Sequence, residues 1–179
     1  MQIILILLSF VFGFLISLID YWEDERKKTP PILFTILASF IFLFLLFSKI
    51  FSIVAGVFLS VAFARKLDAK SWRIFLIATL FFLPFFVLSS FQKTNLSIFS
   101  ILSIFYFFLF SFFDEIASDF ADKQKGKKAK SFIVRFFKLR PFLEISTFAY
   151  SILIFDFDFF ACIFSFDLAY NLEKRLLLI

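Results

Sequence analysis

Five long apolar stretches, separated by short charged segments, constrain the fold of this chain more than any other feature. They cover residues 2–19, 32–48, 50–64, 74–91 and 96–113. The last of them would extend ~27 Å as a helix, close to the ~30 Å hydrocarbon core of a bilayer. A helix satisfies its own backbone hydrogen bonds, as a lipid environment requires. The pattern therefore predicts an all-α protein, a polytopic bundle of transmembrane helices in the cell membrane.

The composition supports a membrane environment and excludes several kinds of chemistry. The chain is 62% hydrophobic and has 36 phenylalanines among its 179 residues, whereas a soluble domain has about 45–50% apolar residues. The absence of histidine removes the usual general base at neutral pH and the commonest zinc ligand. A single cysteine, Cys162, excludes an internal disulfide. Any chemistry must therefore use Asp, Glu, Lys, Arg, Tyr or Ser.

The distribution of basic residues predicts the orientation of the bundle. If all five stretches cross the membrane, 15 Lys and Arg residues lie on one side and only Lys49 and Lys93 on the other. Because cytoplasmic loops carry the excess of positive charge, the N-terminus is expected outside. The net charge of +5 comes from short loops rather than from one solvated face, so we expect anionic lipid headgroups, and no nucleic acid, as partners.

The region 142–172 allows two interpretations. A hairpin with limbs at roughly 142–155 and 159–172 gives seven membrane segments and a charge distribution of 17 against 2. Each limb would cover only ~21 Å and could be re-entrant or thin the bilayer. A single helix over 142–166 gives six segments, but it places Asp156 and Asp158 deep in lipid at ~2.5–3.5 kcal/mol each. The hairpin is favoured. The whole chain, residues 1–179, is predicted to form one integral membrane domain.

Two further patterns concern packing within the bundle. The division between the second and third stretches rests on Lys49, because no glycine or proline marks a turn there.

In the third stretch small residues recur every four positions, which predicts a seam where another helix approaches closely. These residues are Ser52, Gly56, Ser60 and Ala64.

Residues 123–140 form a predicted basic cytoplasmic loop that contains an amphipathic helix. In SFIVRFFKLR, polar residues fall on one helical face and apolar residues on the other, as in a helix that lies in the membrane interface. The polar face has Ser131, Arg135 and Lys138, and the apolar face has Phe132, Ile133, Phe136 and Phe137. The preceding lysines would be drawn to anionic headgroups, although ordinary positive-inside anchoring explains the same pattern.

An acidic cluster follows the fifth stretch and is the main candidate site. On a continued helix Glu115, Asp119 and Asp122 fall within ~60° of one another, with Asp114 beside them. Carboxylates spaced in this way repel each other and require a cation, either the neighbouring lysines or Mg²⁺, which prefers oxygen ligands. The four acids are therefore candidate catalytic residues, and Glu115, Asp119 and Asp122 are also candidate metal ligands.

A second acidic segment ends the first stretch on the same predicted side. Asp20 and Asp24 there are candidate ligands of a second ion, and a metal-bound diphosphate would be balanced by basic residues. The candidate phosphate-binding residues are Arg65, Lys66 and Arg73, and Asp68 and Asp167 join the same side. Salt bridges of Glu23 with Lys27 and of Asp24 with Lys28, each at i, i+4, offer a purely structural alternative.

Two resemblances bear on function. The segment DEIASDFAD resembles the aspartate-rich motifs of UbiA-type intramembrane prenyltransferases, which implies binding of an isoprenoid diphosphate through Mg²⁺. The segments ARKLDAKSW, FDEIASDFADK, RFFKLRPFLEIS and FDLAYNLEK resemble small archaeal multi-pass membrane proteins without an assigned activity. The positions that match this second group are Lys66, Asp68, Asp114, Glu115, Asp119, Asp167 and Tyr170.

These observations leave three functions open. The first, which the two acidic segments favour, is a Mg²⁺-dependent enzyme that handles a polyprenyl or lipid diphosphate at the cytoplasmic membrane edge. The second is a non-catalytic membrane scaffold or transporter subunit, in which the acids and lysines only terminate helices. The third is an ion or proton carrier that uses Asp156 and Asp158.

Overall fold

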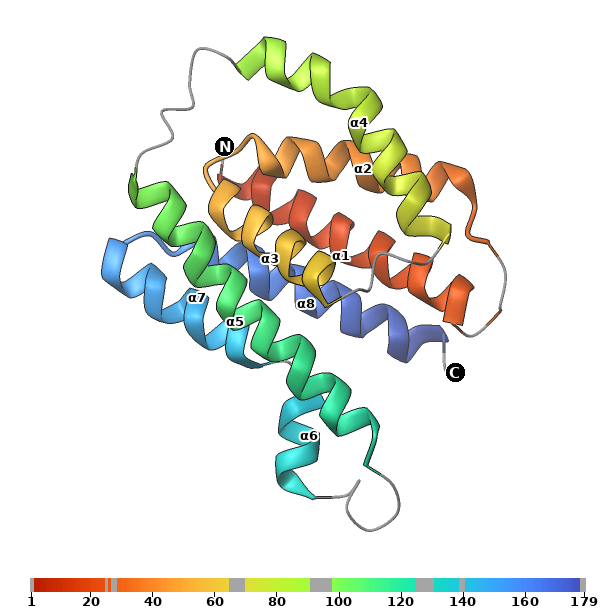
Figure 1. Cartoon of the computed structure of the whole chain (residues 1–179), viewed down its shortest axis with the longest axis vertical. Coiled ribbons are helices and arrows are strands. Elements are labelled where there is room, and N and C mark those ends of the chain that lie inside the picture. Colours follow the sequence, from red (N-terminus) through yellow and green to blue (C-terminus); the bar gives the residue numbers. More distant parts are fainter. Residues whose placement is uncertain are drawn as a thin grey trace. The chain divides into compact units, whose positions relative to one another are not determined.

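The computed structural model describes residues 2–24, 26, 29–64, 70–90, 98–124, 131–138 and 141–177. Their regular structure is entirely α-helical (Figure 1), so the predicted all-α class is confirmed for these residues. The helices are α1 (Gln2–Asp24), α2 (Ile32–Leu46), α3 (Phe51–Phe63), α4 (Lys70–Ser90), α5 (Ile98–Asp122), α6 (Phe132–Lys138), α7 (Pro141–Ile154) and α8 (Asp158–Leu177).

Two of the described helices are long and apolar enough to cross a membrane. The two segments are Ile3–Glu23 in α1 and Ser100–Ala121 in α5, and shorter apolar helices occur at Ile32–Leu46, Phe51–Phe63, Arg73–Phe82 and Pro141–Ile154. The segment in α5 extends past residue 113, where the uninterrupted apolar run ends in the sequence. Asp114 and Glu115 therefore lie within the apolar helix and not beyond its end.

The predicted division between the second and third stretches is confirmed, and a serine makes it. The Ser48 hydroxyl donates to the carbonyl of Leu45 at 2.6 Å and accepts from the amide of Ile50 at 3.3 Å. Such short-range bonds give the backbone an alternative to the helical ladder. The helix therefore stops without a glycine or proline, and α3 begins at Phe51.

A second break, between α7 and α8, excludes a single helix over 142–166. The amide of Asp156 donates to the carbonyl of Ser151 and that of Phe155 to the carbonyl of Ile152, the two bonds of a Schellman motif. Phe155 occupies the left-handed position of this motif with φ 54°. Glycine is the usual residue there because a β-carbon is disfavoured in that conformation.

The described helices group into two compact units. The first unit contains α1, α2, α4 and α8, and the second contains α3, α5, α6 and α7. The integral membrane domain expected over residues 1–179 stays a prediction.

In the first unit, α1 and α8 run parallel and in close contact. The Ser17 hydroxyl donates to the carbonyl of Tyr170 at 3.0 Å, and the Ser165 hydroxyl donates to the carbonyl of Ile6 at 3.0 Å. Between these bonds, a β-carbon added to Gly13 would stand 2.3 Å from the carbonyl oxygen of Phe166. Only glycine allows the two backbones to approach this closely.

The same arrangement recurs in the second unit between α3 and α5, which also run parallel. A β-carbon on Gly56 would stand 2.8 Å from the amide nitrogen of Phe108, and the hydroxyls of Ser60 and Ser111 are 2.5 Å apart. The predicted seam along α3 is therefore confirmed. Both glycine-bearing helices carry small residues at four-residue intervals: Ser9, Gly13 and Ser17 in α1, and Ser52, Gly56 and Ser60 in α3.

Candidate functional site

The acidic half of α5 separates its side chains sharply between the interior and the exterior of the second unit. Asp114 and Glu115 are buried, with 3% and 4% of their surface exposed, and Ser118 is buried beside them. The opposite face has Phe113, Ile116 and Phe120, which are all half-exposed or more. The 3.6-residue helical period therefore directs Asp114 and Glu115 inward while Phe113, Ile116 and Phe120 face outward.

Asp114 caps the N-terminus of α7. Its Oδ1 accepts from the amide of Phe142 at 2.9 Å, and its Oδ2 accepts from the amide of Leu143 at 2.6 Å. The first amides of a helix have no partner within the helix, and Pro141 before them has no N–H at all. A carboxylate on α5 thus fixes the start of α7, and both of its oxygens are engaged in doing so.

The other predicted ligands of the acidic cluster differ in their surroundings. Glu115 is buried whereas Asp119, one turn later, is exposed. Asp122 is the last residue of α5, and its side chain lies outside the described part of the structure. Among the described residues, no group of three or more Asp, Glu, Cys or His side chains is placed to hold a metal ion.

The structure brings together two of the predicted residues in the first unit. The Tyr170 hydroxyl donates to Oδ2 of Asp20 at 2.7 Å, joining the C-terminal halves of α1 and α8. The backbone of Asp24 ends α1, and its side chain is outside the described part. Asp20 belongs to the first unit and Asp114, Glu115 and Asp119 belong to the second.

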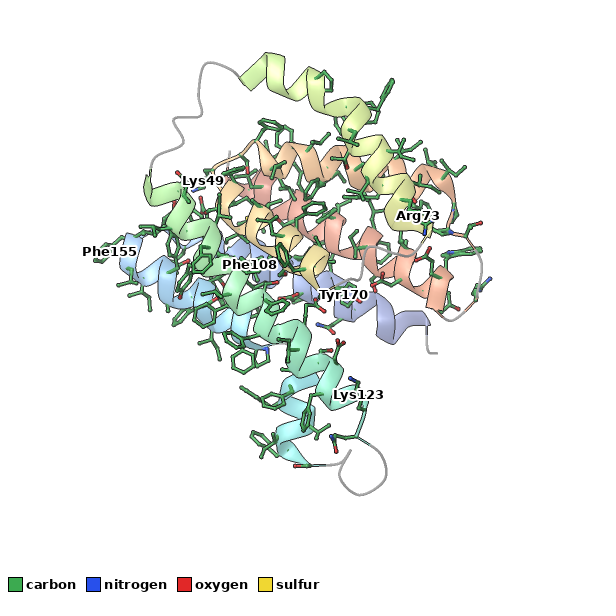
Figure 2. The ribbon with its side chains drawn as sticks, in the orientation of Figure 1. Lys49, Arg73, Phe108, Lys123, Phe155 and Tyr170 are labelled. Carbon is green, nitrogen blue, oxygen red and sulfur yellow. The ribbon has the colours of Figure 1, made fainter. Side chains whose placement is uncertain are left out.

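The predicted phosphate-binding residues are only partly described. Arg65, Lys66 and Asp68 lie outside the described residues. Arg73 is exposed on α4 (Figure 2). Asp167 is partly buried on α8, and its backbone carbonyl accepts from the side-chain amide of Asn171 at 2.8 Å.

Sequence reasoning missed an aromatic group at the end of α1. The guanidinium of Arg26 lies 5.5 Å from the ring centroid of Tyr21 and 5.1 Å from that of Trp22, within the range of cation–π attraction. Tyr and Trp next to a basic residue are typical of a membrane–water interface. The adjacent letters YW before the charged segment were the available signal.

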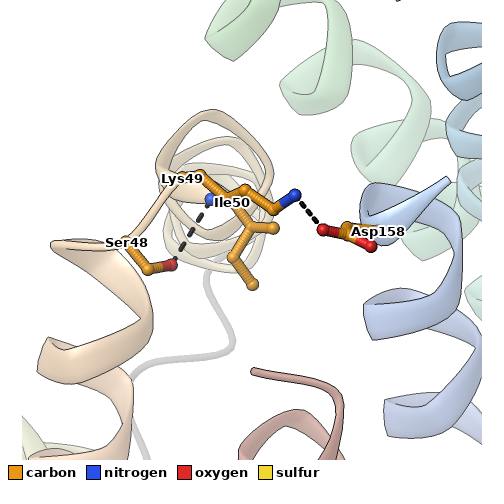
Figure 3. A network of polar contacts seen from close by, with 4 residues as sticks. All are labelled: Ser48, Lys49, Ile50 and Asp158. Atoms are coloured by element: carbon orange, nitrogen blue, oxygen red, sulfur yellow. Dashed lines mark hydrogen bonds and ion pairs between the residues drawn. The ribbon is translucent and has the colours of Figure 1, made fainter. Parts of the chain in front are cut away.

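At the other end of the first unit, Lys49 forms an ion pair with Asp158 (Figure 3). Lys49 lies in the turn between α2 and α3, and Asp158 begins α8, where the helix dipole also favours a negative charge. Both side chains are less than one-third exposed. The sequence placed each residue at a turn on the same side of the bundle, but it did not predict their pairing.

The interior of the second unit contains a series of hydroxyl contacts between helices. The hydroxyls of Ser103 and Tyr150 are 2.9 Å apart, and the Tyr106 hydroxyl donates to the carbonyl of Ser146 at 3.2 Å. With the Ser60–Ser111 contact, these bonds join α5 to α7 on one side and to α3 on the other. Polar side chains thus hold the interior of this unit together.

The α6 helix packs Phe137 against α5 and α7 within the second unit. The ring centroid of Phe137 lies 6.4 Å from that of Phe120 on α5 and 6.0 Å from that of Phe142 on α7. Phe132 and Ile133 at the start of α6 are 81% and 58% exposed. The predicted apolar face is therefore divided, since Phe137 contacts protein while Phe132 and Ile133 face outward.

Comparison of the chain with protein-family models, curated proteins and solved structures gives no match.

Proposed function

We propose that this chain is a multi-pass integral membrane protein that crosses the cell membrane seven times, with its N-terminus outside, and serves as a non-catalytic helical component, a scaffold or transporter subunit. The observation that supports the membrane part is the distribution of polarity in the two units, in which small polar residues are buried among apolar ones and large apolar side chains cover the exterior. Buried positions include serines and threonines at helix contacts, such as Ser17, Ser39, Ser60, Thr147 and Ser151.

The exterior is apolar along the same helices. More than half of the surface of Leu33, Ile77, Phe81, Phe105 and Leu153 is exposed. In water, large exposed apolar areas are a liability, whereas in a bilayer they face lipid and the small polar residues mediate helix contacts. The distribution therefore suits lipid as the surrounding solvent.

The helix directions support the seven-segment topology. A protein with an outside N-terminus and a hairpin over 142–172 would have α1 and α8 both running inward, and these helices are parallel. The same topology makes α3 and α5 parallel and α5 and α7 antiparallel, in agreement with the Ser60–Ser111 and Ser103–Tyr150 contacts.

Labelling of single cysteines tests this topology. In a Cys162→Ser background, Lys93→Cys is expected to react with a membrane-impermeant maleimide added to intact cells. Lys123→Cys is expected to react only after permeabilisation. Reaction of both positions from the same side would contradict an odd number of crossings between them.

Anionic lipid headgroups are the proposed partner of the basic loop at 123–140. Five lysines precede α6 in the sequence, and Phe132 and Ile133 are exposed next to them. Apolar side chains beside a basic segment suit a helix at an anionic surface. Binding of a soluble short-chain phosphatidylglycerol to the detergent-solubilised protein should weaken when Lys125, Lys127 and Lys128 are replaced by Gln.

The non-catalytic function is supported by the contacts that the carboxylates make. Asp114 caps α7, Asp20 accepts from Tyr170, and Asp158 pairs with Lys49. Each contact joins two different segments of one unit. Acidic residues used in this way stabilise the bundle, and a scaffold requires nothing more of them.

A Mg²⁺-dependent enzyme acting on a polyprenyl or lipid diphosphate is the second candidate, and the pair Glu115 and Asp119 favours it. These carboxylates lie one turn apart on α5, and Mg²⁺ usually takes one or two carboxylates together with substrate phosphates. Asp122, later in the same helix, would add a third carboxylate. Asp114 fits a ligand role less well, because both of its oxygens bind amides.

Thermal unfolding of the purified protein in detergent distinguishes the two functions. With Mg²⁺ and inorganic diphosphate added together, a non-catalytic component should show an unchanged midpoint. A raised midpoint that is lost in the Asp119→Asn variant would overturn the proposal in favour of the enzyme. A raised midpoint that Asp119→Asn and Glu115→Gln both retain would indicate a ligand site elsewhere and would also overturn it.

A further inference from the structure

The end of α7 presents a group of apolar side chains that no described part of the second unit covers. We name this group the apolar tip: Ile152, Leu153, Phe155 and Phe157. Leu153 is 76% exposed and Phe155 is 91% exposed. Figure 2 shows Phe155 projecting away from the helices. The ring of Phe157 turns back toward Phe148 on α7, with centroids 6.4 Å apart, so the apolar surface continues from the tip along the helix.

The position of the tip along α5 follows from hydrogen bonds within the unit. Tyr150 lies level with Ser103, since their hydroxyls are 2.9 Å apart. The remaining residues of α7, up to Ile154, advance ~6 Å in the direction of the start of α5. The tip therefore lies near the beginning of the membrane-length segment Ser100–Ala121, level with the exposed residues Ile101 and Leu102.

The backbone at the tip is an independent observation. Phe155 holds a left-handed conformation with φ 54°, at a position where glycine would be favoured. A bulky residue in this conformation is an outlier of the kind that accompanies a functional constraint. The turn would form more easily with glycine, so the constraint at this position concerns the phenylalanine side chain and not the turn.

We infer that the apolar tip inserts into the upper acyl-chain region of the leaflet in which α5 begins, at a depth that leaves the Asp156 carboxylate within reach of the headgroups. The inference rests on the proposed membrane location, and it differs from the sequence expectation of a turn exposed to water on the outer side. Acyl chains are the occupant that suits this surface, because the tip lies level with the exposed residues Ile101 and Leu102 of α5 and has the same aromatic and aliphatic composition as the exposed positions of that helix. Phe155 then acts as an anchor that fixes the depth of the short helix α7.

Fluorescence from single labelled cysteines tests the inference. In the Cys162→Ser background, Phe155→Cys and, separately, Leu153→Cys are labelled with an environment-sensitive fluorophore. The protein is reconstituted in phosphatidylcholine vesicles with a nitroxide on the upper acyl chain. Phe105→Cys on the exposed face of α5 serves as the lipid control, and Lys123→Cys after α5 serves as the water control.

Labels at 153 and 155 are expected to give blue-shifted emission and to be quenched as strongly as the label at 105. Emission and quenching like those of the label at 123, with the label at 105 still quenched, would overturn the insertion alone. Blue-shifted emission without quenching would also overturn it, because the tip would then be covered by a second copy or another protein. If the label at 105 is itself unquenched, the proposed membrane location fails and the inference fails with it.

Discussion

Gly13 on α1 faces the backbone carbonyl of Phe166 on α8 so closely that a β-carbon would lie 2.3 Å from the carbonyl oxygen. The obstructing atoms belong to the backbone, so they cannot move aside as a flexible side chain could. We expect Gly13→Ala to destabilise the first unit by about 1–3 kcal/mol, the usual cost of overpacking. Unfolding in detergent, followed by circular dichroism, measures this change.

The matched control for that substitution is Leu7→Ala, on the exposed side of the same helix. It should change the free energy of unfolding by no more than about 0.5 kcal/mol, as is usual for surface positions. Equal effects of the two substitutions would show that α1 and α8 do not make this close contact.

The cap on α7 makes a prediction about Asp114. Asp114→Ala should cost about 1–3 kcal/mol of stability, because the partly buried amides of Phe142 and Leu143 lose their acceptor. Asp114→Asn should cost less, since one carbonyl oxygen remains. Melting curves of the two variants beside Asp119→Ala, which changes an exposed carboxylate of the same helix, separate a structural cap from a shared metal site. If the two carboxylates shared a metal site, Asp119→Ala and Asp114→Ala would change the effect of Mg²⁺ on the melting temperature to the same extent.

The ion pair between Lys49 and Asp158 should appear as a coupling energy in a double-mutant cycle. Both side chains are mostly removed from solvent, so we expect about 1 kcal/mol of coupling, more than an exposed pair contributes. The cycle uses Lys49→Met, Asp158→Asn and the double variant. A coupling energy of zero would show that the two charges are independently solvated.

Phe155→Gly should stabilise the isolated, detergent-solubilised protein by about 1 kcal/mol, since glycine adopts the left-handed conformation without a steric penalty. Phe157→Gly, two residues later, is the control. Only Phe155 among the described non-glycine residues has positive φ, so Phe157→Gly should bring no such gain. A loss of stability at position 155 in detergent would contradict the strain that we attribute to this residue.

The helix boundaries were the most predictable part of the fold. Each predicted apolar stretch corresponds to a helix, and the breaks at Lys49 and at residues 155–157 lie where charge and length placed them. This success reflects a simple physical constraint, since a run of apolar residues that is removed from water, by lipid or by other helices, must satisfy its backbone hydrogen bonds. Neither long-range contacts nor partners are needed for that prediction.

The candidate site was less predictable because its contacts are distant in sequence. Asp114 was placed with Glu115, Asp119 and Asp122 as one carboxylate stripe. The amides of Phe142 and Leu143 that bind it lie 28 and 29 residues away. A helical wheel places residues on faces, but it does not say which helix covers a face. The pairing of Tyr170 with Asp20 joins two residues that the sequence singled out separately, across 150 positions.

The stripe in α1 was overlooked although the same pattern was recognised in α3. The spacing of Ser52, Gly56 and Ser60 is repeated in α1 by Ser9, Gly13 and Ser17. In α1 these small residues stand among large apolar residues, which makes the repeat harder to recognise in the sequence. Two of the three glycines in the chain therefore have the same structural role, one in each unit.

The recurrence of serine, glycine and serine on α1 and α3 also affects how sequences with this fold can diverge. In the proposed membrane location, lipid requires only that the outer positions stay apolar, so Phe, Leu, Ile and Val can replace one another there with little consequence. The steric requirement at the two glycine crossings, in contrast, admits no substitute. Over evolutionary time the exterior would lose any recognisable similarity first, and a few small residues at fixed intervals would be the last trace of common descent.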